Sequence, residues 1–246
     1  MHRTQGNPPL LLSPDRGIQR VAKVLFRRLS PTYDLVLDYA TLFQDRLWKK
    51  WLVEAASIES NWRVLDLGCG TCVLERYLSQ EGCKVTGLDL TEEMVRIGQA
   101  KKIGCVDSLF VGDAEQLPYA ESTFDAVLSC YVAKYCDEKK FAKEVRRVLK
   151  PGGRVTLYDF SSPRGLFAPF HAFYVFGMMR ILGWLFSHLD SGIGFTFSNL
   201  PEIIRVRRWE DGLLEILRKE GFMGIRIKYL SGGVVTALQA TKAQVT

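Results

Sequence analysis

Short apolar runs that end in an acid or a glycine-rich turn recur through residues 60–160. Runs of four to eight apolar residues between such turns are typical of buried β-strands. We therefore expect a parallel sheet whose strands alternate with helical segments. The expected strands are 63–66, 82–89, 106–111, 124–130 and 154–160, the last opened by a turn at 148–153.

The pattern changes near the C-terminus, where a helical segment at 210–220 precedes two apolar runs at 222–230 and 234–241. Only the turn Ser231-Gly232-Gly233 separates the two runs, and strands joined by so short a connection must be antiparallel. The predicted fold class is therefore α/β, a doubly wound seven-stranded Rossmann-like sheet that is closed by a C-terminal antiparallel hairpin. A dinucleotide-binding half would instead end on a parallel crossover.

The first expected strand leads into a glycine-rich loop. It ends in Asp66, bends at Gly68 and Gly70, and restarts as a helix. Such a turn lets a nucleotide-like ligand lie against bare backbone. The third glycine of a dinucleotide-binding loop is missing, since Cys72 and Val73 follow instead, so the loop alone does not identify the ligand.

Acidic residues stand at the ends of three successive expected strands, at Asp66, Asp89 and Asp113. Asp89 follows the loop at about the 20-residue spacing from which a carboxylate reaches a ribose diol. Asp113 is placed to accept a hydrogen bond from an adenine amine. Parallel strands gather ligands at their carboxyl ends, so we expect the three acids to converge on one crevice. A single acid after a strand is equally well explained as a helix cap or turn former.

In this order, the motifs resemble those of class I S-adenosylmethionine (SAM) methyltransferases. A narrower resemblance is to the ubiquinone/menaquinone-biosynthesis C-methyltransferase family. It rests on the stretch from Phe26 to Asp34, on Thr41 and Trp48, on the segment 147–161 and on the ending 230–235. The match then extends over 24–242. It implies SAM as cofactor, with Tyr33 closing over its methionine end. The other cofactor-binding positions that it implies are Asp66, Gly68, Cys69, Gly70, Thr71, Asp89, Leu90, Met94, Asp113, Ala114, Ser129 and Cys130.

The same resemblance implies a prenylated quinol or a similar lipid as methyl acceptor, methylated on a ring carbon. A ring hydroxyl must then lose its proton, and Tyr33 and His171 are the expected catalytic residues, with Asp34 and Asp159 nearby. The acceptor-side positions depart from the family pattern, which leaves another small molecule or a phospholipid as alternatives. The departures are at Leu37, Asp45, Asp159, Phe195 and Phe197. A further departure is at 133–134 or 134–135, where the family has an Arg-Asn pair that this chain lacks.

The 246 residues are enough for one sizeable core, and we expect a single domain. Its expected parts are a tail (1–16), N-terminal helices (17–58), the SAM-binding core (60–160), an acceptor-side lid (161–205) and the C-terminal helix and hairpin (206–246). The start has no secretory signal pattern, and six cysteines then indicate reduced thiols in a cytoplasm-like compartment. Cys69 and Cys72 form a Cys-x-x-Cys, but no second Cys/His pair stands at zinc spacing.

The most apolar stretch, 165–189, approaches the length of a membrane span. Pro169, Arg180 and its place before the hairpin favour a lid over the acceptor pocket. Together with a net charge of +6, such a lid is consistent with peripheral contact with an anionic membrane. The basic cluster 205–208 is equally consistent with a solvated face.

The basic charge also raises nucleic acid as a partner. The Asn/Asp-Pro-Pro-aromatic element and the Pro-Cys nucleophile of base methyltransferases are both missing from the expected positions, so nucleic acid is disfavoured. A non-catalytic SAM-binding protein is the remaining alternative. The sequence does not predict the oligomeric state.

Overall fold

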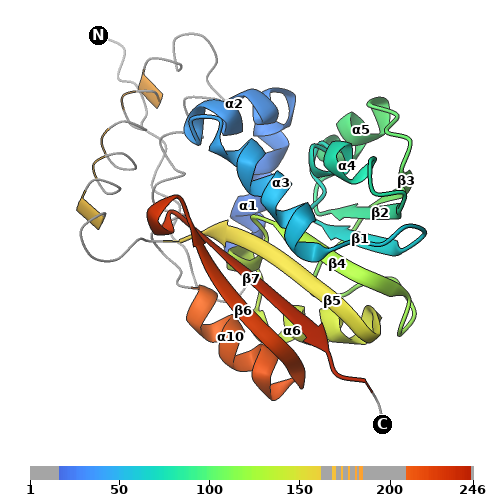
Figure 1. The fold of residues 1–246 in the computed structure, drawn as a ribbon. Coiled ribbons are helices and arrows are strands. Elements are labelled where there is room, and N and C mark those ends of the chain that lie inside the picture. The colour runs from blue at the N-terminus through green and yellow to red at the C-terminus, as the bar shows by residue number, and fades with distance from the viewer. Residues whose placement is uncertain are drawn as a thin grey trace, which may run out of the picture.

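The computed structural model describes residues 17–161 and 209–244, with positions 168–169, 173, 177, 181 and 183–184 between them. These residues form a seven-stranded sheet in the order β3-β2-β1-β4-β5-β7-β6 (Figure 1). The strands are β1 (Arg63–Leu67), β2 (Lys84–Asp89), β3 (Val106–Val111), β4 (Phe124–Cys130), β5 (Leu149–Phe160), β6 (Phe222–Leu230) and β7 (Val235–Lys242). The helices described here are α1 (Gly17–Leu29), α2 (Tyr33–Ala40), α3 (Gln44–Ala56), α4 (Leu74–Leu78), α5 (Glu92–Ala100), α6 (Glu138–Val148) and α10 (Trp209–Lys219).

Strands β3, β2, β1, β4 and β5 run parallel to one another, and β7 pairs antiparallel with both β5 and β6. The short 3₁₀ turn Ser231–Gly233 joins β6 to β7. So short a connection cannot carry the chain back to the opposite end of the sheet, which is why the pair is antiparallel. The predicted α/β sheet with a C-terminal antiparallel hairpin is therefore confirmed.

The start of the fifth strand differs from the prediction. β5 begins at Leu149, opposite Phe124, and its register against β4 shifts before regular pairing resumes at Arg154. Gly152, at φ +77°, allows the sharp bend within the strand. The segment predicted as a turn before the strand is therefore an irregular first part of the strand itself.

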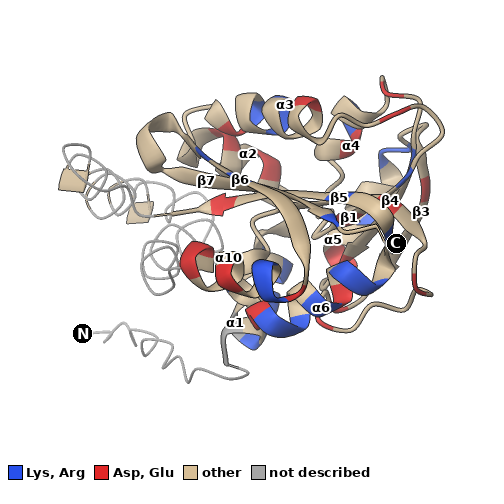
Figure 2. Ribbon diagram, turned by 60° about the horizontal axis from the view of Figure 1, so that its bottom comes forward, with Lys and Arg blue, Asp and Glu red and all other residues tan. Residues whose placement is uncertain are grey.

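Helices cover both faces of the sheet. Figures 1 and 2 show α3 and α4 on one face and α6 and α10 on the other. Leu65 and Leu67 of β1 join the core cluster that contains Trp209 of α10, whereas Val64 joins the cluster under Trp48 of α3. This alternation follows the two-residue period of a strand and decides where each polar side chain of β1 points.

The N-terminal helices are tied to the hairpin at the other end of the chain. Trp48 Nε1 on α3 donates a hydrogen bond of 2.9 Å to Ser231 Oγ in the β6–β7 turn, and Gln44 also bonds to Ser231. The Trp48 ring packs edge-on against Tyr158 and Phe160 of β5. Two of the sequence segments that carried the family resemblance are therefore in direct contact.

Among the described residues, no helix combines the length and apolar character that crossing a membrane requires. Most of the predicted lid at 165–189 lies outside the described residues. His171, Phe195, Phe197 and the basic cluster 205–208 also lie outside them, so the predictions for these positions stay untested.

Candidate active site

A cavity of about 80 Å³ lies at the carboxyl ends of the parallel strands, under α1. Helix α1 is held over it by a 2.7 Å hydrogen bond from Gln19 Nε2 to Glu115 Oε1 and by an ion pair between Arg27 and Glu93. We call it the cofactor cavity. Its wall consists of Gln19, Ala22, Lys23, Phe26, Gly68, Leu88, Asp89, Leu90, Thr91, Gly112, Asp113, Ala114, Tyr131, Val132, Tyr135 and Cys136.

The glycine at the end of β1 is a steric necessity. Gly68 has φ +77°, and a Cβ added to it would lie 2.2 Å from Val132 Cγ2. Any side chain would collide with the segment after β4 and fill the wall of the cofactor cavity. The bare backbone expected from the sequence at this position is therefore present.

Asp89 borders the cofactor cavity at the end of β2. Its Oδ2 accepts a hydrogen bond from the Gly70 amide (3.0 Å), and its Oδ1 accepts from the amide and the hydroxyl of Thr91 (2.9 and 2.8 Å). Burial raises the pKa of Asp89, and these hydrogen bonds oppose the increase. The carboxylate thus connects the glycine-rich loop to β2 while one side of it faces the cavity.

Asp113 borders the same cavity at the end of β3. Its Oδ1 accepts from the Glu115 amide at 2.9 Å, so it also forms the turn that a lone acid after a strand commonly forms. The structure shows the turn-forming role, and the predicted contact of Asp113 with an adenine amine stays a prediction. Leu90 and Ala114, two further predicted cofactor residues, line the cavity beside these two acids.

Asp66 does not border the cofactor cavity. β1 continues through Asp66 to Leu67, and Asp66 pairs with Gly87 inside the sheet. Its side chain therefore lies on the face that carries α4, beside Glu75. Burial and the Glu75 carboxyl raise the pKa of Asp66 well above its usual value, and burial raises that of Glu75 to about 8. Asp89 and Asp113 thus border the cofactor cavity and Asp66 does not, and a contact of Asp66 with the cofactor stays a prediction.

Several other predicted cofactor residues stand behind the cavity wall. Thr71 Oγ1 donates to the Asp34 carboxylate, and Ser129 Oγ donates to the Leu67 carbonyl at 2.8 Å. Met94 is buried on α5. Cys69, Gly70 and Cys130 likewise stand outside the wall, so their roles as cofactor residues stay predictions.

A second, smaller cavity of about 40 Å³ adjoins the first and is lined mainly by apolar and aromatic side chains. We call it the aromatic cavity. The side chains of Phe26, Tyr131 and Tyr135 border both cavities, so they form the partition between the two. Its full wall is Leu25, Phe26, Leu29, Tyr33, Val36, Leu37, Ala40, Tyr131, Lys134, Tyr135 and Phe160.

A buried ion pair provides the charge at the aromatic cavity. Lys134 Nζ lies 2.8 Å from Asp159 Oδ1, and the two side chains are 2% and 0% exposed. The Lys134 ammonium also faces the rings of Phe160, at 4.8 Å from the centroid, and Tyr135, at 5.3 Å. Burial raises the pKa of Asp159, and Lys134 opposes that increase. The sequence suggested each residue separately but gave no sign that they pair.

A second buried network lies between the aromatic cavity and α3, and the sequence analysis did not predict it. Asp45 accepts hydrogen bonds from Tyr131 Oη (2.7 Å) and Tyr158 Oη (3.1 Å) and pairs with Lys49. Tyr131 is held at φ +63°, a conformation that is uncommon for a residue other than glycine. Asp45, which departs from the family pattern, therefore fixes the tyrosine that separates the two cavities.

Comparison with known proteins agrees with this arrangement. Residues 15–242 match the model of the ubiE/COQ5 methyltransferase family. A demethylmenaquinone methyltransferase of Streptomyces avermitilis is 34% identical over 94% of this chain and 98% of its own length. The ubiquinone/menaquinone biosynthesis C-methyltransferase UbiE of Psychromonas ingrahamii is 32% identical over 86% of each chain.

A solved structure shares the fold. Phosphoethanolamine N-methyltransferase 2 of Haemonchus contortus, determined in complex with SAM, superposes with a TM-score of 0.58 at 17% identity, over 80% of this chain and 52% of that one. In this chain, the bare backbone at Gly68 and the two carboxylates at adjacent strand ends suit a nucleoside with a ribose and an exocyclic amine. With the family match over almost the whole chain, these features show that this protein is a SAM-dependent methyltransferase and belongs to the ubiE/COQ5 methyltransferase family.

Proposed function

We propose that this enzyme methylates a ring carbon of a prenylated quinol. The observation that carries the proposal is the aromatic cavity, which shares a wall of three rings with the cofactor cavity and contains a buried ammonium group. The apolar and aromatic wall, with one ammonium in it, suits the chemistry of a flat apolar ring that bears an ionisable hydroxyl. The names of the two relatives, which refer to demethylmenaquinone and to ubiquinone/menaquinone biosynthesis, support the same acceptor class.

In methyl transfer, the cofactor and the protein have separate roles. Bound SAM supplies a methyl group that is already electrophilic, so the protein must align the acceptor carbon and exclude water. A ring carbon becomes nucleophilic when the neighbouring hydroxyl loses its proton to solvent. The Lys134 ammonium is placed to stabilise the resulting oxyanion, and the ion pair with Asp159 orients that ammonium. Lys134 is thus our candidate catalytic residue, and Asp159 is a positioning residue.

Tyr33 contributes a neutral hydroxyl. It lines the aromatic cavity at the start of α2, and its ring packs edge-on against Phe26. Burial, with Asp45 as the next contribution, raises the pKa of Tyr33 well above its usual value of 10.0. The hydroxyl therefore keeps its proton near neutral pH, and we assign it the role of a hydrogen-bond donor to the acceptor oxygen and not that of a base.

Asp34, which the sequence analysis placed near the acceptor hydroxyl, is bonded to other partners. Its Oδ2 pairs with Lys101 at 2.8 Å, and its Oδ1 accepts from Thr71. We propose that it ties α2 to the glycine-rich loop.

The acceptor assignment predicts a dependence on redox state and pH. The enzyme should transfer a deuterium-labelled methyl from SAM to a ring carbon of a prenylated quinol, and it should leave the oxidised quinone unmodified, since only the quinol has a hydroxyl that ionises. The rate should rise with pH until that ionisation is complete. Mass spectrometry of the products, under anaerobic reducing conditions and after chemical oxidation, measures both. Equal turnover of the oxidised form, label on oxygen or nitrogen, or label found only in phospholipid would contradict the proposal.

We further propose peripheral contact with a membrane at the mouth of the aromatic cavity. The inner face of α2 lines that cavity through Val36 and Ala40, whereas α2, α3 and the turn between them expose Leu35, Tyr39, Leu42, Phe43 and Leu47. An apolar outer surface next to an apolar cavity suits entry of a prenyl tail from a bilayer.

Flotation with anionic lipid vesicles tests the membrane contact. The protein should float at low salt and be released at high salt, because the apolar contact is small and the net charge of +6 assists it. A Leu42→Ser/Leu47→Ser variant should float less, whereas Ile227→Ser, which alters an exposed apolar residue on β6, should not. Protein that stays in the soluble fraction at low salt would contradict the idea.

A further inference from the structure

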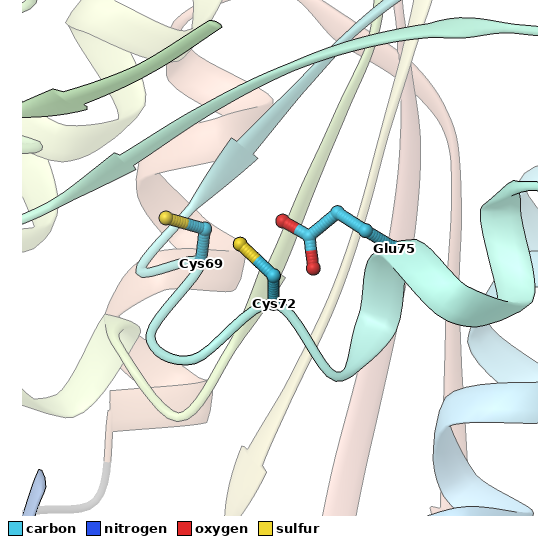
Figure 3. A group of neighbouring side chains, drawn as sticks. All are labelled: Cys69, Cys72 and Glu75. Atoms are coloured by element: carbon cyan, nitrogen blue, oxygen red, sulfur yellow. The ribbon is translucent and has the colours of Figure 1, made fainter. Parts of the chain in front are cut away.

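Three side chains that can bind a metal come together beneath the cofactor loop. The sulfurs of Cys69 and Cys72 and a carboxylate oxygen of Glu75 all lie within 4.8 Å of one another. Figure 3 shows Glu75 reaching back from the beginning of α4 toward Cys72, which stands between it and Cys69. The three residues are spaced by three along the chain. Cys69 and Cys72 lie in the loop, and Glu75 is the second residue of α4, which begins at Leu74.

The carboxyl group of Glu75 is buried, and neither of its oxygens has a hydrogen-bond partner of good geometry within the described part of the chain. Glu75 as a whole is 0% exposed. Asp66, on β1, lies beside it, and its Oδ1 is also unpartnered among the described residues. Buried polar groups are nearly always satisfied, and here, within the described structure, Glu75 has only the Asp66 carboxyl and the Cys72 thiol as polar side-chain neighbours, so this buried acidic cluster calls for an explanation.

The surroundings form a closed site. Cys72 is fully buried, and its sulfur lies so close to Gly98 of α5 that a Cβ there would be 2.6 Å from it. The Cys69 sulfur lies against Gly87 of β2 in the same way, at 2.9 Å. Two glycines thus make room for the sulfurs. Cys72 itself has φ +60°, a conformation that glycine adopts more easily, so a cysteine here needs a reason beyond loop geometry.

We propose that Cys69, Cys72 and Glu75 form a structural zinc site, with Asp66 as the neighbouring carboxyl that supports Glu75. Thiolates select a borderline-soft cation over Mg²⁺ or Ca²⁺, and zinc accepts carboxylate ligands in addition to sulfur. On binding, the two thiol protons and the proton of the Glu75 carboxyl, whose pKa is raised to about 8, pass to solvent, and the cation takes two thiolates and one carboxylate in their place. The Glu75 oxygens would then be satisfied by the metal.

The role of such a site follows from its position. It would join the glycine-rich loop to α4, and none of the three side chains borders the cofactor cavity. The metal would therefore rigidify the loop and take no part in methyl transfer. This inference does not depend on the identity of the acceptor.

Cobalt substitution tests the site directly. The full chain, prepared without a histidine tag, stripped of metal and kept under a non-thiol reductant, is titrated with Co²⁺ and then with Zn²⁺. We expect one Co²⁺ per chain, with thiolate-to-cobalt charge-transfer absorption in the near ultraviolet, which one Zn²⁺ abolishes. Wild-type protein without this absorption would overturn the proposal, whatever the variants do.

Two conservative variants assign the ligands. Glu75→Gln and Cys72→Ser should each weaken zinc binding by at least about tenfold, because even groups outside the ligand shell are commonly worth that much. Cys83→Ser, which alters a buried cysteine outside the cluster, should bind as wild type does. The thermal unfolding midpoint should rise with zinc concentration in the wild type and Cys83→Ser alone. Unchanged zinc affinity in Glu75→Gln and Cys72→Ser would overturn the assignment.

Discussion

Lys134→Met is expected to lower turnover by about 10²- to 10³-fold, the usual loss when a donor to a developing oxyanion is removed. Binding of SAM should change little, because Lys134 lines the aromatic cavity and not the cofactor cavity. The rate-versus-pH curve should also move to higher pH, since the acceptor hydroxyl would ionise without help from the ammonium. Steady-state kinetics across pH, with calorimetric titration of SAM, measures all three.

The same substitution leaves Asp159 buried without a counter-charge, which commonly costs about 3–5 kcal/mol of folding free energy. The double variant Lys134→Met/Asp159→Asn removes that unpaired charge, so it should regain much of the stability. If Lys134 acts on the acceptor, turnover stays low in the double variant. Recovery of turnover together with stability would show that the lysine only completes the fold.

Tyr33→Phe provides the comparison. It removes a neutral hydroxyl from the same cavity and leaves no buried charge behind, so the loss of turnover should be smaller and the fold should be unaffected. A reduction in SAM affinity instead of turnover would place the hydroxyl at the cofactor, as the family resemblance implies.

The sheet was predictable from the sequence because its signals are local. A run of apolar residues between turns specifies a buried strand, and a three-residue connection between the last two runs leaves only an antiparallel pair. β5 was predicted less well at its start, where Leu149 already pairs with Phe124 through an irregular register that Gly152 permits. Such an irregularity depends on the neighbouring strand, which the local sequence does not describe.

The polar groups also differ in how well the local sequence predicts their positions. Asp89 and Asp113 follow their strands directly, so their placement at the cavity edge was predictable. Asp66 was misplaced because β1 runs one residue further, and the alternation of side chains then turns its carboxyl toward α4. Lys134 and Asp159 are 25 residues apart and meet only because β4 and β5 are neighbours. The Cys-x-x-Cys of Cys69 and Cys72 is evident in the sequence, but zinc patterns made of Cys and His alone do not include Glu75.

Asp89→Ala is expected to weaken SAM binding by about ten- to a hundredfold, corresponding to about 1.5–3 kcal/mol for a hydrogen bond to a charged group. Part of the loss would be indirect, because the amides of Gly70 and Thr91 lose their common acceptor and the loop is less firmly held. Thr91→Val separates the two contributions, since it removes one loop hydrogen bond and leaves the carboxylate in place.

Calorimetric titration with SAM compares these variants with Asp107→Ala, which alters an exposed acid on β3 away from the cofactor cavity. We expect a small loss of affinity for Thr91→Val and none for Asp107→Ala. If Thr91→Val weakens binding as much as Asp89→Ala does, the carboxylate acts by holding the loop and not by contacting the ribose. Unchanged affinity in Asp89→Ala would remove this residue from the cofactor site altogether.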